Sequence, residues 1–244
     1  MIVLTGPGRS GTSLLASLYR ELGFDPGGLW HDEVNAGFED KRCVDLNQAV
    51  LEGLGTNPNG QRADVPPAVR SSLKHFVPKS IRQRARQQVR ARTPQRSIPP
   101  VRWSSIPEIV DRLGPQLKEY AQGRAVVKDP RFCFTLRVWL ASGAPIDHVV
   151  VTVRDSGASA ASRVEASLSK FADEDTMRTS TVLGLGTLFD TLLSGDVPYT
   201  VLRYPAWPTS VDDVAALPFP EPVAPGDVRA ALERVCDPAL LRQK

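Results

Sequence analysis

The sequence contains few of the residues that stabilise secreted or metal-binding proteins. Three cysteines occur among its 244 residues, and their spacing fits neither a zinc-binding pair nor a disulfide framework. We therefore expect reduced thiols in a reducing compartment. Each cysteine is expected to be a small core residue rather than a nucleophile. The three are Cys43, Cys133 and Cys236.

Long hydrophobic runs are also missing. No stretch approaches the roughly eighteen apolar residues that span a bilayer, and the first apolar stretch begins at Ile2, which leaves no room for a secretion signal. We therefore expect a soluble, cytoplasmic protein. With 41% hydrophobic residues, the chain can bury one substantial core, so a single domain over residues 1–244 is expected.

One part of the chain lacks acidic residues. Between Val65 and Pro107 there are ten Lys and Arg residues and no Asp or Glu, whereas the rest of the chain has 20 basic against 27 acidic residues. The segment is rich in Pro, Gln and Ser, a composition that disfavours a packed core of its own, although Ile81, Ala85 and Val89 recur at the spacing of a helix face. We therefore expect a basic, mobile insertion at about 57–104.

The role of this insertion has several interpretations. It is either a solvated insertion, a lid that recruits an anionic acceptor, or an arm that touches a membrane surface or a polyanionic glycan. Nucleic acid is the least favoured partner, because no recognisable nucleic-acid-binding module accompanies the charge.

A glycine-rich turn follows the first predicted strand. Residues 2–5 are apolar or β-branched, and Gly6 and Gly8 allow the backbone to approach a ligand closely. Thr12 and Ser13 then open a predicted helix, so that free amide groups and the positive end of the helix dipole meet at one point. This arrangement predicts an anion-binding loop that holds a nucleotide. The alternative is a turn that merely closes a βα unit.

The loop differs from a Walker A sequence in the position of its cation. A Walker A loop places lysine directly after its second glycine, whereas here Thr12 follows Gly11 and the cation is Arg9. The sequence Arg9-Ser-Gly-Thr-Ser-Leu-Leu15 resembles the 5′-phosphosulfate loop of sulfotransferases that use 3′-phosphoadenosine 5′-phosphosulfate (PAPS), in particular the bacterial Arg-Ser-Gly-Thr type. This resemblance implies a P-loop-like fold and a donor 5′-phosphate bound by Gly8, Arg9, Ser10, Gly11, Thr12 and Ser13.

Two further segments strengthen the resemblance. Lys128-Asp-Pro at the end of a predicted strand resembles the same tripeptide in tyrosylprotein and many bacterial sulfotransferases. Arg154 ends another strand and Ser162 follows eight residues later, a spacing similar to the element that grips the 3′-phosphate of PAPS. The chain departs from the family in two places. Ser156 stands where family members usually have proline, and a C-terminal Gly-x-x-Gly-x-x-Lys element is missing.

Alternating strands and helices indicate the fold class. We expect an α/β protein, a single P-loop-like three-layer domain with a mainly parallel sheet, and ligands at the carboxyl ends of the strands. The first predicted helix begins at residue 13. The others cover about 38–51, 105–120, 132–141, parts of 157–193 and 226–235. The predicted strands after the first cover 125–128, 146–153 and 199–203.

The resemblance implies sulfuryl transfer to an acceptor hydroxyl, in which Arg9 and Lys128 stabilise charge on the leaving phosphate without a metal ion. An acceptor hydroxyl also needs a base. Glu39 is one candidate, because Gly37-Phe38-Glu39 resembles the Gly-aromatic-Glu of bacterial members, and Asn47 falls where they commonly carry Leu-Asn.

His31 and Glu33 are the other candidates, since the tyrosylprotein branch places its base near them. A purely structural role is the alternative for Glu39, because acids in a first helical turn favourably meet the helix dipole.

The acceptor stays open among small-molecule, glycan, lipid and peptide hydroxyls. Two other functions are compatible with the sequence: a degenerate nucleotide-binding module without turnover, and a P-loop metabolite kinase. The missing Walker lysine argues against the kinase.

Overall fold

Four parallel strands form the central sheet. A computed structural model describes residues 1–31, 36–56, 100–165, 174–209, 214 and 216–236. Within these residues the strand order is β4-β1-β5-β6, with all three pairings parallel. The strands are β1 (Ile2–Thr5), β4 (Val126–Lys128), β5 (His148–Val153) and β6 (Tyr199–Arg203).

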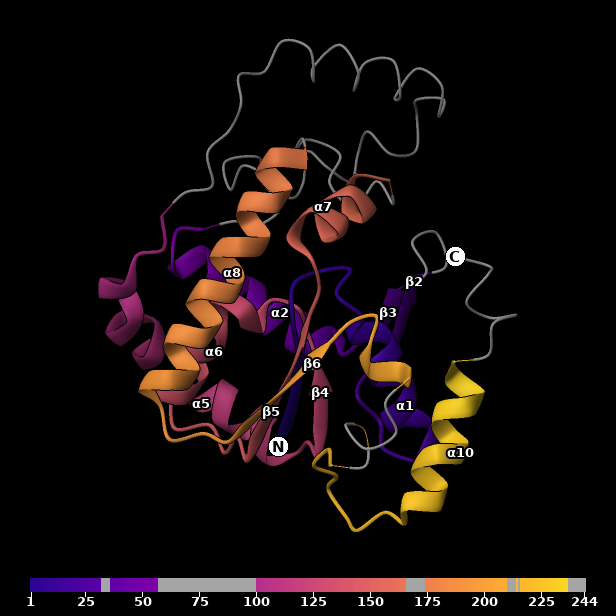
Figure 1. The fold of residues 1–244 in the computed structure, drawn as a ribbon. Coiled ribbons are helices and arrows are strands. Elements are labelled where there is room, and N and C mark those ends of the chain that lie inside the picture. The colour runs from indigo at the N-terminus through magenta and orange to yellow at the C-terminus, as the bar shows by residue number, and fades with distance from the viewer. Residues whose placement is uncertain (32–35, 57–99, 166–173, 210–213, 215, 237–244) are drawn as a thin grey trace, which may run out of the picture.

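Helices cover both faces of this sheet (Figure 1). On one face lie α2 (Lys41–Gly53), α5 (Ile106–Gln122), α6 (Phe132–Ala141) and α8 (Glu174–Ser194), which share a core with the strand residues Val3, Val127, Val149 and Val151. The other face carries α1 (Thr12–Glu21) and α10 (Pro225–Val235), packed against Ile2, Leu4, Val126, Val150 and Leu202. The strands are apolar on both sides because both sides are buried. The predicted three-layer α/β fold with a parallel sheet is thus confirmed.

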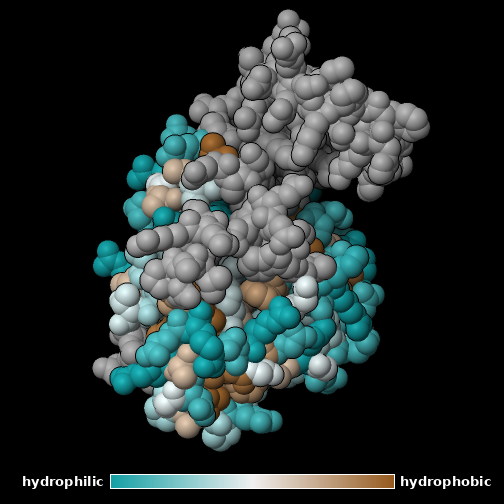
Figure 2. All heavy atoms as spheres, turned by 90° about the vertical axis from the view of Figure 1, so that its right-hand side faces the viewer, coloured by the Kyte–Doolittle hydropathy of each residue, from teal (hydrophilic) through white to brown (hydrophobic). Residues whose placement is uncertain are grey.

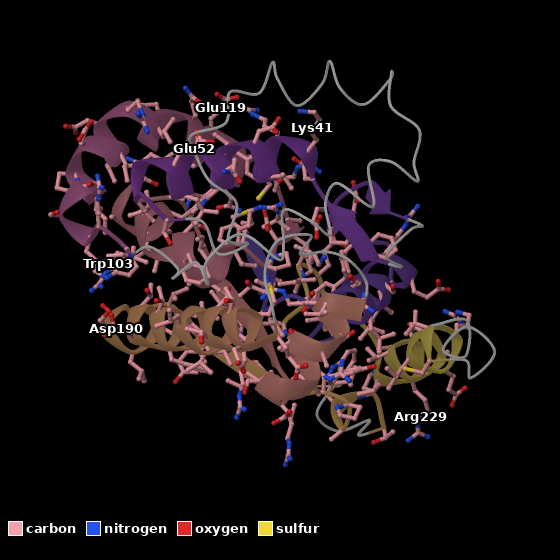
Figure 3. All side chains as sticks on the ribbon, turned by 90° about the horizontal axis from the view of Figure 1, so that it is seen from above. Lys41, Glu52, Trp103, Glu119, Asp190 and Arg229 are labelled. Carbon is pink, nitrogen blue, oxygen red and sulfur yellow. The ribbon has the colours of Figure 1, made fainter. Side chains whose placement is uncertain are left out.

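The strand order has a switch point at β1. After β1 the chain reaches β4 on one side, and after β4 it crosses to β5 on the other side. Open α/β sheets bind ligands at such a switch point, outside the carboxyl ends of the strands. Figure 3 views the molecule from this end, with α2 (Lys41, Glu52) and α8 (Asp190) on one side and α10 (Arg229) at the opposite side.

The start of α2 differs from the sequence prediction. A helix was expected from about Phe38, but β2 (Leu29–His31) and β3 (Ala36–Glu39) form an antiparallel pair, and α2 begins only at Lys41. Asp40 is the N-cap, and its carboxylate accepts a hydrogen bond from the Cys43 amide at 3.0 Å. Phe38 has a φ of 63°, which is not a right-handed helical value. Glu39 therefore ends a strand instead of lying in a first helical turn.

The other predicted elements agree more closely with the structure. The bounds of α6 and β6 are those predicted, and α7 (Ser156–Glu165), α8 and α10 lie where helices were expected. At the start of α5, the N-cap residue Ser105 makes no side-chain cap hydrogen bond. Instead a 3-10 turn, η2 (Trp103–Ser105), leads into the helix.

Most of the predicted basic insertion, residues 57–99, lies outside the described residues. Within the described part of the chain, no helix combines the length and the apolar character that crossing a membrane would require. Figure 2 shows the side of the molecule that carries α1 and α10, where the described surface is mostly hydrophilic with apolar residues exposed in small groups. This distribution fits helices whose apolar side faces the sheet.

Candidate functional site

The glycine-rich loop between β1 and α1 is a tight turn at the switch point of the sheet. A Cβ added to Gly6 would lie 2.2 Å from the Thr152 carbonyl oxygen, so β5 approaches the loop more closely than a side chain allows. Arg9 has a φ of 69°, an uncommon value for a residue other than glycine. Such strained backbone is often found where a loop contacts a ligand.

The N-terminus of α1 opens into the same place. Its N-cap, Gly11, has a φ of 96° and provides no side-chain cap. The first amide groups of a helix have no partner within the helix, and the helix dipole adds positive potential there. The ring of Tyr204 covers Gly11 closely, because a Cβ on Gly11 would lie 2.7 Å from the ring atom Cδ2. Tyr204 therefore forms a wall of the site.

Arg154 and Ser162 both contact Arg9. The Arg9 Nε donates a hydrogen bond to Ser162 Oγ at 3.0 Å, and Arg154 Nη1 donates to the Arg9 carbonyl oxygen at 3.2 Å. The Arg154 guanidinium also stacks over the Tyr204 ring, 5.3 Å from its centroid. The structure thus joins the glycine-rich loop to the Arg154–Ser162 segment, as expected if both serve one ligand.

Lys128 lies on the opposite side of the loop. Its side chain is 1% exposed. The Nζ donates to Glu39 Oε1 at 2.7 Å and to the Gly37 carbonyl oxygen at 2.9 Å, and it lies 3.4 Å from Ser13 Oγ. Two residues chosen from the sequence for different roles, Lys128 as a cation and Glu39 as a base, therefore form one ion pair beside the start of α1.

A buried polar network fixes the turn that follows Lys128. The Asp129 carboxylate is fully buried and accepts hydrogen bonds from Asn47 Nδ2 at 2.9 Å and from Arg131 Nη1 at 3.0 Å. Its charge raises the pKa of the Arg131 guanidinium. On its other side, Asn47 Oδ1 accepts hydrogen bonds from Thr135 and Trp139. Satisfied networks of this kind restrict side-chain geometry, so Lys128 leaves the sheet in a defined direction.

The remaining candidates divide between the loop and its surroundings. Ser10 is buried, with its hydroxyl 2.9 Å from Thr152 Oγ1 and its amide donating to the Pro7 carbonyl at 3.1 Å, so these groups stabilise the loop itself. Thr12 is 3% exposed at the start of α1. His31 ends β2, but its side chain is not described, and Glu33 lies outside the described residues.

Sequence reasoning missed two residues at this site, Tyr204 and Arg163. Tyr204 directly follows β6, so a search of the residues at the carboxyl ends of the predicted strands would have found it. Arg163 is only 8% exposed and lies behind Gly8, where a Cβ would be 3.6 Å from the Arg163 Nε. Burial lowers the pKa of its guanidinium. No signal in the sequence distinguishes it from a solvated arginine.

The chemistry of the site is that of anion binding. Lys128 lies beside Ser13 in the first turn of α1, and Arg9, Arg154 and Arg163 bring guanidinium groups to the glycine-rich loop before it. Among the described residues, no group of three His, Cys, Asp or Glu side chains is placed to hold a metal ion. Comparisons with models of protein families, with curated protein sequences and with solved structures found no match to this chain. The functional assignment therefore rests on the site itself.

Proposed function

We propose that this protein is a sulfotransferase that moves a sulfuryl group from PAPS to a hydroxyl of a small-molecule, glycan or lipid acceptor. One observation carries the proposal: three strand-end segments, far apart in the sequence, meet at the glycine-rich loop. Ser162 is 153 residues from the Arg9 side chain that it binds, and Lys128 is 115 residues from Ser13.

The residues present fit the anionic groups of PAPS. The 5′-phosphosulfate suits the uncapped start of α1, where Ser13 and Thr12 supply hydroxyl groups and the backbone supplies amide donors. The 3′-phosphate suits Arg154 and Ser162, because a guanidinium fork and a hydroxyl donor together match a dianionic phosphate. Tyr204 offers an aromatic surface between these two regions.

In the proposed reaction, the acceptor oxygen forms a bond to sulfur while the bond between sulfur and the 5′-phosphate oxygen breaks. The negative charge moves onto the leaving phosphate, where Arg9, Lys128 and the amide groups of α1 stabilise it. The acceptor proton passes to a base. Glu39 is the candidate whose position is described, and a proton that it accepts would lie beside Lys128. His31 and Glu33 remain the competing candidates.

The first test is a binding measurement. We expect adenosine 3′,5′-bisphosphate to bind without metal and about 10- to 100-fold more tightly than AMP, because a charge-assisted hydrogen bond contributes about 1.5–3 kcal/mol. Calorimetry with both nucleotides, and with ATP plus Mg²⁺, measures this. Equal affinity for adenosine 3′,5′-bisphosphate and AMP would contradict the proposal. Tight binding only of ATP with Mg²⁺ would also contradict it and would favour a kinase.

The second test is sulfuryl transfer from labelled PAPS to a panel of hydroxyl acceptors. Glu39→Gln, His31→Ala and Glu33→Gln, compared under single-turnover conditions, identify the base, since only its loss should abolish transfer while the affinity for the bisphosphate persists.

A nucleotide-binding module without turnover is the second candidate. The observation in its favour is the ion pair between Lys128 and Glu39, in which two residues proposed for catalysis are bound to each other. This alternative predicts normal binding of the bisphosphate and no transfer to any acceptor.

A further inference from the structure

Strand β6 is an open edge of the central sheet. It pairs with β5 on one side only, over Tyr199–Arg203. Figure 1 looks onto this edge, with β6 in front of the other strands. Edge strands expose unpaired amide and carbonyl groups, which proteins commonly protect with lysine, proline or a bulge. Residues 199–203 contain no lysine or proline, and their register with β5 runs without a shift, so this edge has none of these protections.

The backbone groups that point outward from β6 can be identified from its pairing. The Tyr204 amide donates to the Val153 carbonyl oxygen at 2.7 Å. Alternate residues of a parallel strand bond to the same neighbour, so the even-numbered residues of β6 face β5. The amide and carbonyl groups of Tyr199, Val201 and Arg203 therefore point away from the sheet, and no hydrogen bond joins them to a residue that the structure describes.

Exposed large hydrophobic side chains gather beside this edge. Among the described residues, all of them lie on β6 and on α8, the helix that precedes it. They are Leu193 (73% exposed), Val182 (54%), Leu183 (47%), Val201 (42%) and Tyr199 (38%). Single exposed apolar residues are normal in a monomer, whereas a contiguous group of them marks a contact surface.

Helix α8 contributes its side next to β6. The Phe189 ring meets the Tyr199 ring edge-on, with the centroids 6.4 Å apart. Val182 lies seven residues before Phe189 and Leu193 four residues after it, so both leave the helix on that side. Because side chains alternate along a strand, Val201 shares the face of β6 that carries Tyr199. These five residues form an apolar strip along the open edge.

We propose that two copies of this chain associate through β6, with the two strands antiparallel about a two-fold axis at Val201. Val201 then lies opposite Val201 of the partner subunit, and Tyr199 opposite Arg203 of the partner subunit. In this register all three outward residues of each strand are paired, and each facing pair exchanges two hydrogen bonds. The sheet continues through both chains, and the two apolar strips lie on the same face.

The sequence of β6 favours a second copy as the partner. An arginine opposite a tyrosine is a favourable cross-strand pair, because the guanidinium is attracted to the face of the ring. The two-fold axis forms this pair twice. A register centred on Arg203 would instead place two like charges opposite each other, which is destabilising. The strand is thus complementary to itself. This inference concerns assembly and is independent of the proposed function.

Sedimentation equilibrium of the full chain over a range of concentrations measures the association. We expect a reversible dimer. Val201→Lys should raise its dissociation constant at least about 30-fold, because the variant places two like charges at the axis. Leu193→Lys, in the α8 part of the apolar strip, should also weaken the dimer. Both side chains are exposed, so both variants should keep the melting temperature of the native monomer.

Leu183→Lys is the matched control. Leu183 is also exposed, but it lies seven residues before Asp190, on the side of α8 that binds Arg137 of α6. This variant adds the same charge to the same helix outside the apolar strip. It should leave the dissociation constant unchanged.

A crosslink tests the register. Facing residues of a hydrogen-bonded antiparallel pair have Cα atoms about 5.5 Å apart, which a disulfide can bridge. In a Cys236→Ser background, we expect oxidised glutathione to produce a covalent dimer from Val201→Cys and none from Leu183→Cys. Equal crosslinking of the two cysteine variants would contradict the register.

Two results would overturn the inference. One is a chain that stays monomeric at every concentration, in which slow hydrogen exchange of the Val201 amide would assign the edge to another segment of the same chain. The other is a dimer whose dissociation constant is the same in Val201→Lys as in Leu183→Lys, which would place the interface elsewhere.

Discussion

Two cationic side chains at the site, Lys128 and Arg131, are each held in an ion pair with a carboxylate. Lys128 is 1% exposed and bound to Glu39, whose side chain is 16% exposed, while Arg131 is bound to the fully buried Asp129. Buried charges are tolerated only when they are paired and hydrogen-bonded. The same contacts that stabilise the turn after β4 thus orient the cation assigned to the leaving phosphate.

The pair of Lys128 and Glu39 gives an asymmetric prediction for stability. Glu39→Ala leaves the ammonium group buried without its carboxylate, so we expect it to lower the free energy of unfolding by about 3–5 kcal/mol. Lys128→Met removes the more deeply buried charge and leaves Glu39, which reaches solvent, so its cost should be clearly smaller. Urea denaturation measures both values.

Lys41→Met is the control for this comparison, because it breaks an exposed pair with Asp45 and should cost at most about 1 kcal/mol. If Lys128→Met lowers the free energy of unfolding as much as Glu39→Ala does, desolvation of the ammonium group does not determine how much this ion pair contributes to stability.

The three thiols should differ sharply in reactivity. Burial raises the pKa of Cys133 to about 12, and it also raises the pKa of Cys43. Cys236, in contrast, is half-buried at the end of α10. Because only the thiolate reacts, we expect a disulfide reagent at pH 8 to modify Cys236 quickly and the other two only after unfolding.

The raised pKa values also fix the direction of a pH effect. The neutral thiols favour the folded state fully below the unfolded pKa of about 8.5, and this contribution is lost as the pH rises from there towards 12. Titration of thiols with and without denaturant, in the native chain and in Cys236→Ser, checks the assignment. Rapid modification of Cys236→Ser in the native state would show that a core thiol is accessible.

Among the secondary-structure elements, those with strong local patterns were predicted well. Helix α6 and strand β6 have the predicted bounds because each is a mostly apolar segment between clear breaks in the sequence. The pair β2–β3 was missed, since Ala36–Glu39 has no alternating apolar pattern and its conformation depends on contacts with distant residues. The wrong start of α2 followed from the same omission.

The residues of the candidate site likewise divide into those that the sequence could identify and those that it could not. Arg9, Lys128 and Arg154 could be identified because they belong to short motifs that resemble those of sulfotransferases and that follow predicted strands, whose carboxyl ends meet at one edge of a parallel sheet. Arg163 could not, because it lies within a helix and its burial arises only when α7 packs behind the loop.

Gly27, in the segment before β2, is packed so closely that the methyl group of an alanine there should destabilise the protein. Gly27 has a φ of 141°, and a Cβ there would lie 2.5 Å from the Asp40 amide nitrogen and 2.6 Å from the Glu39 carbonyl carbon. Since backbone atoms cannot move aside cheaply, we expect Gly27→Ala to cost more than about 1 kcal/mol and to displace Glu39. Thermal denaturation and transfer activity measure the two effects.

Gly186→Ala is the matched control, because Gly186 lies in α8 and, apart from its chain neighbours and the backbone of its own helix, none of the atoms that the structure describes lies within 4 Å of an added Cβ. Alanine favours a helix over glycine by about 0.5–1 kcal/mol, so this variant should be more stable than the native chain. Equal stability of the two variants would contradict the proposed tight contact at Gly27.

Across the whole molecule, charge is distributed unevenly. The chain carries a net charge of +3, yet ten basic residues lie between Val65 and Pro107 without an acidic one, and the rest has 20 basic against 27 acidic residues. Fields of this kind attract oppositely charged molecules and weaken as salt is added. The sequence predicts that the basic segment takes part in capturing the acceptor.

Neutralising part of this segment tests that role. Changing Arg82, Arg84, Arg86 and Arg90 together to Gln should raise the KM for an anionic acceptor and flatten its dependence on salt, because the attraction acts on encounter with the acceptor. Binding of adenosine 3′,5′-bisphosphate should change little, since none of these residues belongs to the proposed nucleotide site.

The control replaces four exposed basic residues elsewhere, Arg112, Lys118, Arg178 and Arg229, by Gln and so removes the same total charge. Kinetics at low and high salt should then separate a local effect from a change in net charge. An equal rise of KM in both variants would show that net charge alone acts, and an unchanged KM in the first would leave the segment without a part in acceptor capture.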